Sequence, residues 1–228
     1  MSDEPLEDAE LPWYRGPAFL LFVVLMTVYA VGTFVGNDGY GNHLINVLLL
    51  ASLFLGVKKI TRSQRAVRIA LVIFLIGFVG EKLGTWALGR EAIVWDYWTN
   101  LIFFGAVLVF LIAAVVKAER VDADTVFAAA DVFMLMGMVW AYAFMLVYAA
   151  DPTAFSLSPH DQTQAGSALL HYSFTTLTTV GYGSISPMSD MARMLSDIEA
   201  LIAQLYLAVV VARLVSLQIE HSRKNSGE

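Results

Sequence analysis

The chain has 228 residues, of which 58% are hydrophobic and only 15% are charged, and its mean hydropathy is +0.66. A soluble domain is nearer half apolar and a quarter charged, so this composition predicts an integral membrane protein surrounded by lipid. The absence of cysteine excludes disulfides and thiolate metal sites, and the net charge of -6 argues against a nucleic-acid partner.

The N-terminal segment is acidic, because it reads MSDEPLEDAELPW. A cleavable signal peptide would begin with positive charge instead. We therefore expect residues 1–16 to form a cytosolic N-terminal tail, followed by a permanent first span.

Apolar runs long enough to cross a bilayer recur along the chain. A helix needs roughly 20 such residues to cross the hydrocarbon. The second run is short and, by length alone, could be re-entrant. We predict an all-α membrane protein with six spans, in chain order Pro17–Val35, His43–Val57, Ala66–Trp86, Trp98–Val116, Val126–Ala149 and Met191–Leu217.

The basic residues favour six spans, because cytoplasmic loops collect Lys and Arg. With both termini inside, only Lys82, Arg90 and Arg193 of the 14 Lys and Arg residues would lie outside. A re-entrant second run would move every later loop to the other side. We therefore predict a multi-pass protein of the cell (inner or plasma) membrane with both termini cytoplasmic.

The segment between the fifth and sixth spans contains the most informative motif. Residues 150–190 have no Lys or Arg and are expected outside. Within them SALLHYSFTTLT suggests a helix too short to cross, followed by TTVGYG at Thr178–Gly183. Such irregular backbone at membrane depth is tolerated where it is buried in protein or lines water. This predicts a re-entrant pore loop; the alternative is a Gly-Tyr-Gly turn between two helices.

The stretch TTVGYG, preceded by Thr175 and Thr176, resembles the selectivity filter of potassium channels. The resemblance implies that main-chain carbonyls, together with the Thr179 hydroxyl, replace the water shed by a permeant K⁺. Glycine would allow the backbone to alternate between ordinary and left-handed conformations. The ion-binding residues implied are Thr179, Val180, Gly181, Tyr182 and Gly183.

The resemblance extends over about residues 127–217 and implies a homotetramer, since one filter copy per chain supplies one of four walls. The expected organisation is a voltage-sensor-like four-helix bundle over 17–120, a pore domain over 121–217 and a cytosolic tail over 218–228. The pore domain would comprise an outer helix, a pore helix, the filter and an inner helix. The expected partners are membrane lipid, further copies of the chain and K⁺ as the permeant ion. No cofactor and no enzymatic activity are expected.

The residues expected to support the filter depart from the family pattern. Many potassium channels have a carboxylate pair behind the filter, where this chain has Ser184 and Thr175. Two usual tryptophans are replaced by His171 and Tyr172, and Tyr172 could still bond to Tyr182. His171 is either a titrating group behind the filter or a neutral pore-helix histidine. The full support set is Thr175, Thr178, Tyr172, His171, Ser184 and Glu199.

The last span resembles the inner helix of prokaryotic potassium channels, which often read E-A-x-x-G-Q-x-Y. Glu199, Gln204 and Tyr206 match, and Ala203 replaces the hinge glycine, which favours a straighter helix. We expect Glu199 to hold the pore helix through Thr175 or a backbone amide; direct ion coordination is the alternative. Val210 and Leu214, near the inner end, could form an apolar constriction.

Strong voltage gating is not expected. The fourth span has no arginine, whereas steep voltage dependence needs several gating charges per subunit. Arg62, Arg65 and Arg68 are spaced by three, but they lie between the second and third spans, where the positive-inside rule explains them. The predicted function is a passive potassium-selective channel. The alternatives are a weakly selective monovalent cation channel and a non-conducting scaffold with a relic filter.

Overall fold

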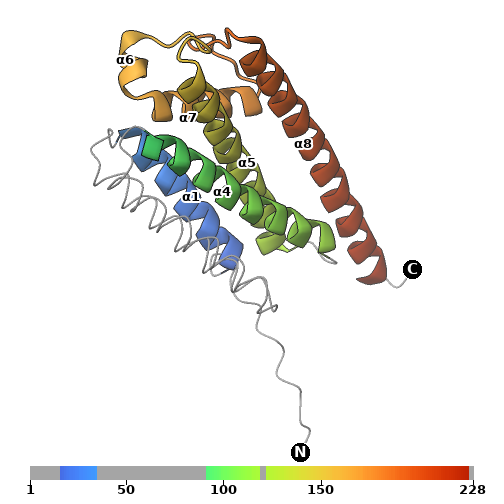
Figure 1. The fold of residues 1–228 in the computed structure, drawn as a ribbon. Helices are drawn as coiled ribbons and strands as arrows, with labels where there is room; N and C mark the ends of the chain where they lie inside the picture. Colours follow the sequence, from blue (N-terminus) through green and yellow to red (C-terminus); the bar gives the residue numbers. More distant parts are fainter. Residues whose placement is uncertain (1–15, 35–90, 119–121, 226–228) are drawn as a thin grey trace, which may run out of the picture.

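The computed structural model describes residues 16–34, 91–118 and 122–225, and the secondary structure in these ranges is helical apart from one isolated β-bridge. The second and third predicted spans, the three spaced arginines and residues 1–15 and 226–228 lie outside the described residues. Most of the predicted C-terminal tail, residues 218–225, continues helix α8. The helices, shown in Figure 1, are α1 (Pro17–Phe34), α4 (Glu91–Lys117), α5 (Ala123–Ala150), α6 (Pro159–Thr163), α7 (Ala165–Leu177) and α8 (Asp190–Asn225).

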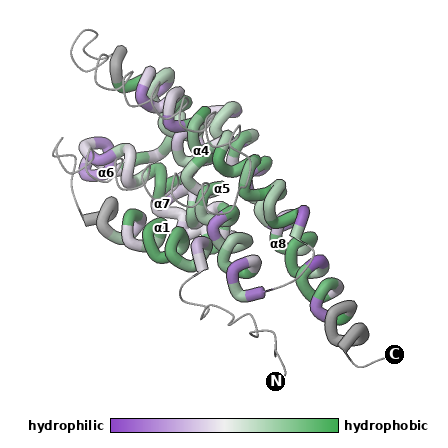
Figure 2. Tube along the Cα trace, turned by 90° about the horizontal axis from the view of Figure 1, so that it is seen from below, coloured by the Kyte–Doolittle hydropathy of each residue, from purple (hydrophilic) through white to green (hydrophobic). Residues whose placement is uncertain are grey.

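Among the described residues, three helical segments are long and apolar enough to cross a membrane. They are Ile93–Lys117, Ala123–Ala150 and Asp190–Ile219, and Pro17–Ala30 is a shorter apolar helix. These segments coincide with the predicted fourth, fifth, sixth and first spans. Figure 2 shows apolar residues along most of α4, α5 and α8, with polar residues gathered at α6 and near helix ends. An all-helical multi-pass membrane protein is therefore supported.

Helix α5 occupies the centre of the described structure, because α1, α4, α7 and α8 all pack against it (Figure 1). The core between these helices includes Leu25, Leu111 and Leu135, none of which is exposed. The helix begins at an Asp122 N-cap, whose carboxylate accepts a hydrogen bond from the Thr125 amide at 2.7 Å. Anything that moves α5 would therefore disturb every neighbouring helix.

The start of α1 is tied to the start of α5. Asp124 Oδ1 accepts a hydrogen bond from the Ala18 amide at 2.9 Å, which places a carboxylate at the positive end of the α1 dipole. A Cβ on Gly16 would lie 2.2 Å from the same oxygen, so only glycine leaves room for this contact. The contact fixes the N-terminal ends of the two helices together.

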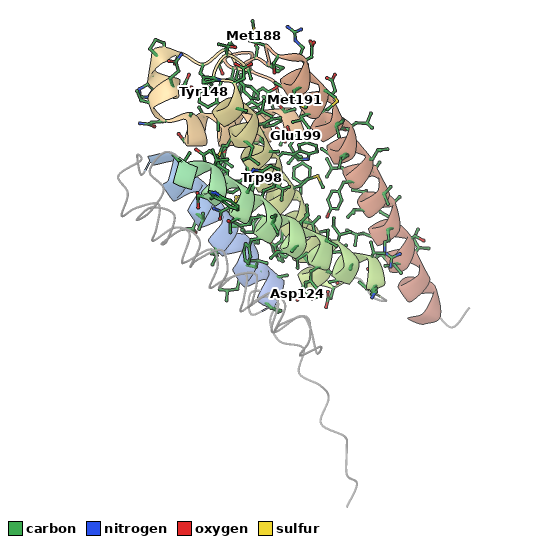
Figure 3. All side chains as sticks on the ribbon, viewed as in Figure 1. Trp98, Asp124, Tyr148, Met188, Met191 and Glu199 are labelled. Atoms are coloured by element: carbon green, nitrogen blue, oxygen red, sulfur yellow. The ribbon has the colours of Figure 1, made fainter. Side chains whose placement is uncertain are left out.

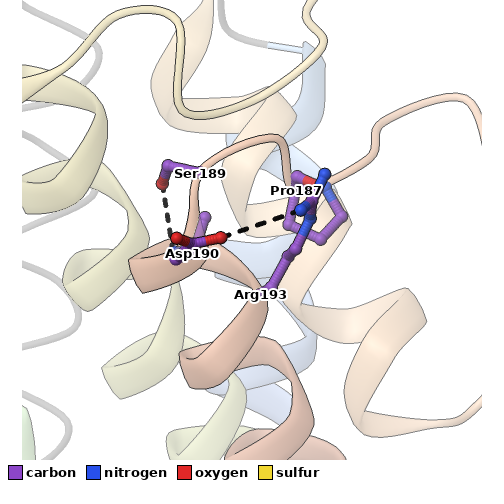
Figure 4. A network of polar contacts seen from close by, with 5 residues as sticks. Pro187, Ser189, Asp190 and Arg193 are labelled. Atoms are coloured by element: carbon purple, nitrogen blue, oxygen red, sulfur yellow. Dashed lines mark hydrogen bonds and ion pairs between the residues drawn. The ribbon is translucent and has the colours of Figure 1, made fainter.

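The loops on either side of α7 are joined to each other. Phe155 and Pro187 form an antiparallel bridge, and the Ser156 amide donates to the Ser186 carbonyl at 2.9 Å. Just beyond, the Ser189 hydroxyl accepts a hydrogen bond from the Ala192 amide at 3.2 Å and thereby caps α8 (Figure 4). The chain that leaves the TTVGYG segment is thus anchored before α8 begins.

Candidate functional site

Helix α7 is the short helix that the sequence predicts before TTVGYG. Its 13 residues extend about 20 Å at 1.5 Å per residue, too short to cross the hydrocarbon. It packs against both α5 and α8, and it approaches α5 closely at Gly137. A Cβ on Gly137 would lie 2.9 Å from the Phe174 ring, so the absence of a side chain there allows the two helices to meet.

Three successive amides after α7 bond back to that helix. The Thr179 amide donates to the Thr176 carbonyl at 2.9 Å. The Val180 and Gly181 amides both donate to the Thr175 carbonyl, at 2.9 and 3.1 Å. None of the described peptide bonds is cis, and a trans peptide points its C=O opposite to its N–H. The carbonyls of Thr178, Thr179 and Val180 therefore point away from α7.

The backbone of the segment is left-handed at alternate residues. Thr179, Gly181 and Gly183 have φ of 59°, 52° and 77°. The alternation between ordinary and left-handed residues that the two glycines predict is present. It also includes Thr179, two residues before the first glycine. A left-handed β-branched residue is an outlier, so Thr179 is held there by its surroundings, including the hydrogen bonds of the flanking amides.

The aromatic contacts behind the segment differ from the expectation for Tyr172. Its hydroxyl is 2.6 Å from Ser196 Oγ of α8, in a buried pair, and does not bond to Tyr182. His171 contacts Tyr182 instead, with the two rings stacked 5.9 Å apart at 7°. The reason is the direction of the two side chains: Tyr172 lies on the buried side of α7, whereas His171 lies on its exposed side.

Glu199 holds α7 as expected, but through a different residue. Its Oε1 lies 2.5 Å from the hydroxyl of Ser173, not from Thr175 or an amide. The same hydroxyl donates to the Gly137 carbonyl of α5 at 2.8 Å. Glu199 and Ser173 are both fully buried, and Figure 3 shows Glu199 on the side of α8 that faces α5. One serine thus joins three helices.

The other residues predicted to support the filter make local contacts or none. Thr175 Oγ1 donates to the Tyr172 carbonyl at 2.9 Å, and Thr178 Oγ1 donates to the Phe174 carbonyl at 2.6 Å. These bonds stay within α7 and its C-terminal end. Ser184 is exposed, and the structure gives no hydrogen bond to its side chain. The carboxylate pair that the family pattern places behind the filter has no replacement at these positions.

Helix α8, the predicted inner helix, runs unbroken from Asp190 to Asn225. Ala203, at the expected hinge, is fully buried, and the Tyr206 hydroxyl donates to the Ala129 carbonyl of α5 at 2.7 Å. Val210 packs against the core, and Leu214 is partly buried. Their role as a gate stays a prediction.

Towards its C-terminal end, α8 is also joined to α4. Arg213 Nη2 donates to the carbonyls of Val116 and Ala118, the latter at 3.1 Å. A helix leaves its last four carbonyls without intrahelical partners, and a cation is favoured at that negative end. The guanidinium thus caps the end of α4 from α8, a link that the positive-inside rule applied to the sequence does not reveal.

Comparison with known families supports this region as an ion channel domain. Residues 134–219 match the family described as an ion channel, and the match includes most of α5, all of α7, the TTVGYG segment and most of α8. No curated protein and no solved structure gives a significant match. The described helices and this match support a multi-pass membrane protein that contains an ion channel domain.

Proposed function

We propose that four copies of this chain form a potassium-selective channel, with Thr179–Gly183 of each copy lining one quarter of the filter. The observation that carries the proposal is the direction of the carbonyls. The Thr178, Thr179 and Val180 oxygens point away from the helix that supports them, and alternate residues are left-handed. A file of oxygens on one side of a chain can replace the hydration shell of a cation.

Assembly around an axis is supported by what a single chain leaves exposed. Val180 and Tyr182 are 52% and 72% exposed, and only 6% of the membrane window of α8 is buried within the chain. Exposed apolar residues lie on several sides of α8, including Leu201, Ile202 and Leu207. Neighbouring copies and lipid would cover these surfaces. A four-fold arrangement closes the ring of oxygens that one chain leaves open.

A weakly selective cation channel is the second candidate, and the outer end of the segment favours it. Among the described residues, Tyr182 contacts the rest of the chain through ring stacking on His171, and Ser184 forms no hydrogen bond. A less firmly held outer end would let the carbonyl ring adapt to Na⁺. The inner end, by contrast, is held by amide bonds to Thr175 and Thr176.

Reversal potentials under bi-ionic conditions separate the candidates. The purified protein is reconstituted into planar bilayers with K⁺ on one side and Na⁺ on the other. We expect the reversal potential to shift strongly toward the K⁺ equilibrium potential and Ba²⁺ to block the current. A reversal potential near zero would favour the weakly selective channel. The absence of current, together with absence of K⁺ flux from liposomes at any pH or voltage, would reject both in favour of a non-conducting scaffold.

A further inference from the structure

The contact between Ser173, Glu199 and Gly137 raises a question of proton number. The Ser173 oxygen lies 2.5 Å from Glu199 Oε1 and 2.8 Å from the Gly137 carbonyl oxygen. A serine hydroxyl carries one proton, and a carbonyl oxygen carries none. With an ionised carboxylate, one proton would have to serve both contacts. One pair of oxygens would then face each other without a hydrogen between them.

A second proton on Glu199 satisfies both contacts. The carboxylic acid then donates to Ser173 Oγ, and Ser173 donates to the Gly137 carbonyl. A hydroxyl donating to a carboxylate can also be as short as 2.5 Å, so length alone does not decide between the two forms. The Gly137 contact decides, because only the acid form leaves a proton for it.

The surroundings of Glu199 favour the same form. Its second oxygen, Oε2, is buried and has no hydrogen-bond partner among the described residues, and no described cation pairs with it. Burying an unpaired charge costs far more than burying a neutral polar group. The nearby hydroxyl of Tyr172 is engaged with Ser196. The other titratable or charged residues on the three helices are His171 on α7, Asp124, Asp131, Tyr142 and Tyr148 on α5, and Asp190, Arg193, Asp197, Tyr206, Arg213, Glu220, His221, Arg223 and Lys224 on α8.

We infer that Glu199 is a neutral carboxylic acid and a proton-binding site, and that its proton completes a hydrogen-bond chain from α8 through Ser173 of α7 to α5. Release of this proton leaves the single Ser173 proton to serve one of two acceptors, the Glu199 carboxylate or the Gly137 carbonyl, and places a charge between the helices. Helix α7 would then lose one of the two buried hydrogen bonds that Ser173 forms with its neighbours. Since the amides of the TTVGYG segment bond to α7, the proton on Glu199 also helps to position that segment.

Infrared spectroscopy of the full-length protein in K⁺-containing membranes at neutral pH tests the protonation directly. We expect a carboxylic-acid C=O band that is lost in Glu199→Gln and retained in Asp131→Asn, a matched acid-to-amide control. Ser173→Ala should shift the band, because the acid loses its acceptor. A spectrum unchanged by Glu199→Gln would overturn the inference.

A labelling experiment keeps the test decisive if Glu199→Gln does not assemble. Glutamate carrying ¹³C at the side-chain carboxyl should shift the band in the wild-type protein, and Ser173→Ala should shift the labelled band again. Labelled aspartate should leave this band in place. A band whose position does not change with the glutamate label, or one that Ser173→Ala leaves unchanged, would overturn the assignment.

The consequence for conduction rests on the proposed channel function and has its own readout. We expect K⁺ flux of the wild type to fall as the pH is raised, and flux of Glu199→Gln to persist, because the amide can still donate to Ser173. Identical pH profiles would overturn the link to conduction. If neither protein conducts at any pH, the proposed function fails, while the infrared band still decides the protonation of Glu199.

Discussion

Replacing Gly181 by alanine tests the left-handed backbone on which the proposed filter depends. In the chain, a Cβ at this position would meet nothing within 4 Å, so a clash inside the chain is not the expected cause of any effect. The expected cause is the backbone, because φ is 52° and a side chain in the left-handed region costs about 1–2 kcal/mol per residue. In four chains this amounts to about 4–8 kcal/mol for the assembled filter.

Gly105→Ala in α4 is the matched control. Its new Cβ would also meet nothing within 4 Å, but Gly105 is in an ordinary helix, where alanine is favoured over glycine by about 0.5–1 kcal/mol. Both variants are reconstituted into liposomes at equal protein content, and the K⁺ flux down an imposed K⁺ gradient is measured. We expect the K⁺ flux of Gly105→Ala to match that of the wild type and the K⁺ flux of Gly181→Ala to fall at least about tenfold. A cost of 1–2 kcal/mol already changes a population by a factor of about 5–30. Equal flux in the two variants would refute the reasoning.

Four further predictions address the packing that holds the site. Ser196→Ala should lower the free energy of unfolding by about 1–3 kcal/mol, since a buried tyrosine hydroxyl loses its partner, and a lower melting temperature would show it. Asp131→Leu, which keeps the branched shape but removes two buried oxygens with no partner among the described residues, should raise the melting temperature, and a fall would contradict this. Arg213→Gln should lower the free energy of unfolding by about 0.3–2 kcal/mol, because the end of α4 loses its cap, and a lower melting temperature would show it. An unchanged melting temperature would contradict the contact. The Asp151 carboxylate accepts hydrogen bonds from the Thr153 hydroxyl and amide, and these bonds lower its pKa. Their contribution to stability is therefore present above the unfolded pKa and is lost as the pH falls through the folded pKa. Thr153→Val should raise the pKa of Asp151 in an NMR titration, and an unchanged pKa would contradict the assignment.

The elements that could be predicted from the sequence are those that depend on local patterns. Long apolar runs located the spans at α5 and α8, and the short polar and apolar run before Thr178 located α7 to within a few residues. The fourth span was less well predicted, since α4 begins at Glu91, ahead of the expected Trp98. Residues such as Asp96 and Asn100 are polar, but they bond to each other inside the helix, which hydropathy does not register.

The contacts that join α7 to its neighbours could not be predicted, because they depend on which faces of three helices meet. Glu199 was expected to contact α7, yet its partner Ser173 looked like an ordinary serine in the sequence. The signal that was available is Gly137, a glycine in the middle of an apolar span, which marks a close approach between helices. Left-handed Thr179 had no local signal, because a β-branched residue rarely adopts that conformation.

The central claim is that main-chain oxygens of Thr179, Val180, Gly181 and Tyr182 from four chains face a shared axis and bind K⁺. Structure determination of the protein purified in K⁺, with thallium replacing K⁺ in a second sample, tests it most directly. We expect a four-fold assembly with axial density at the level of these oxygens and a matching anomalous signal for thallium. A monomer or dimer, or a tetramer whose carbonyls face away from an empty axis, would contradict it.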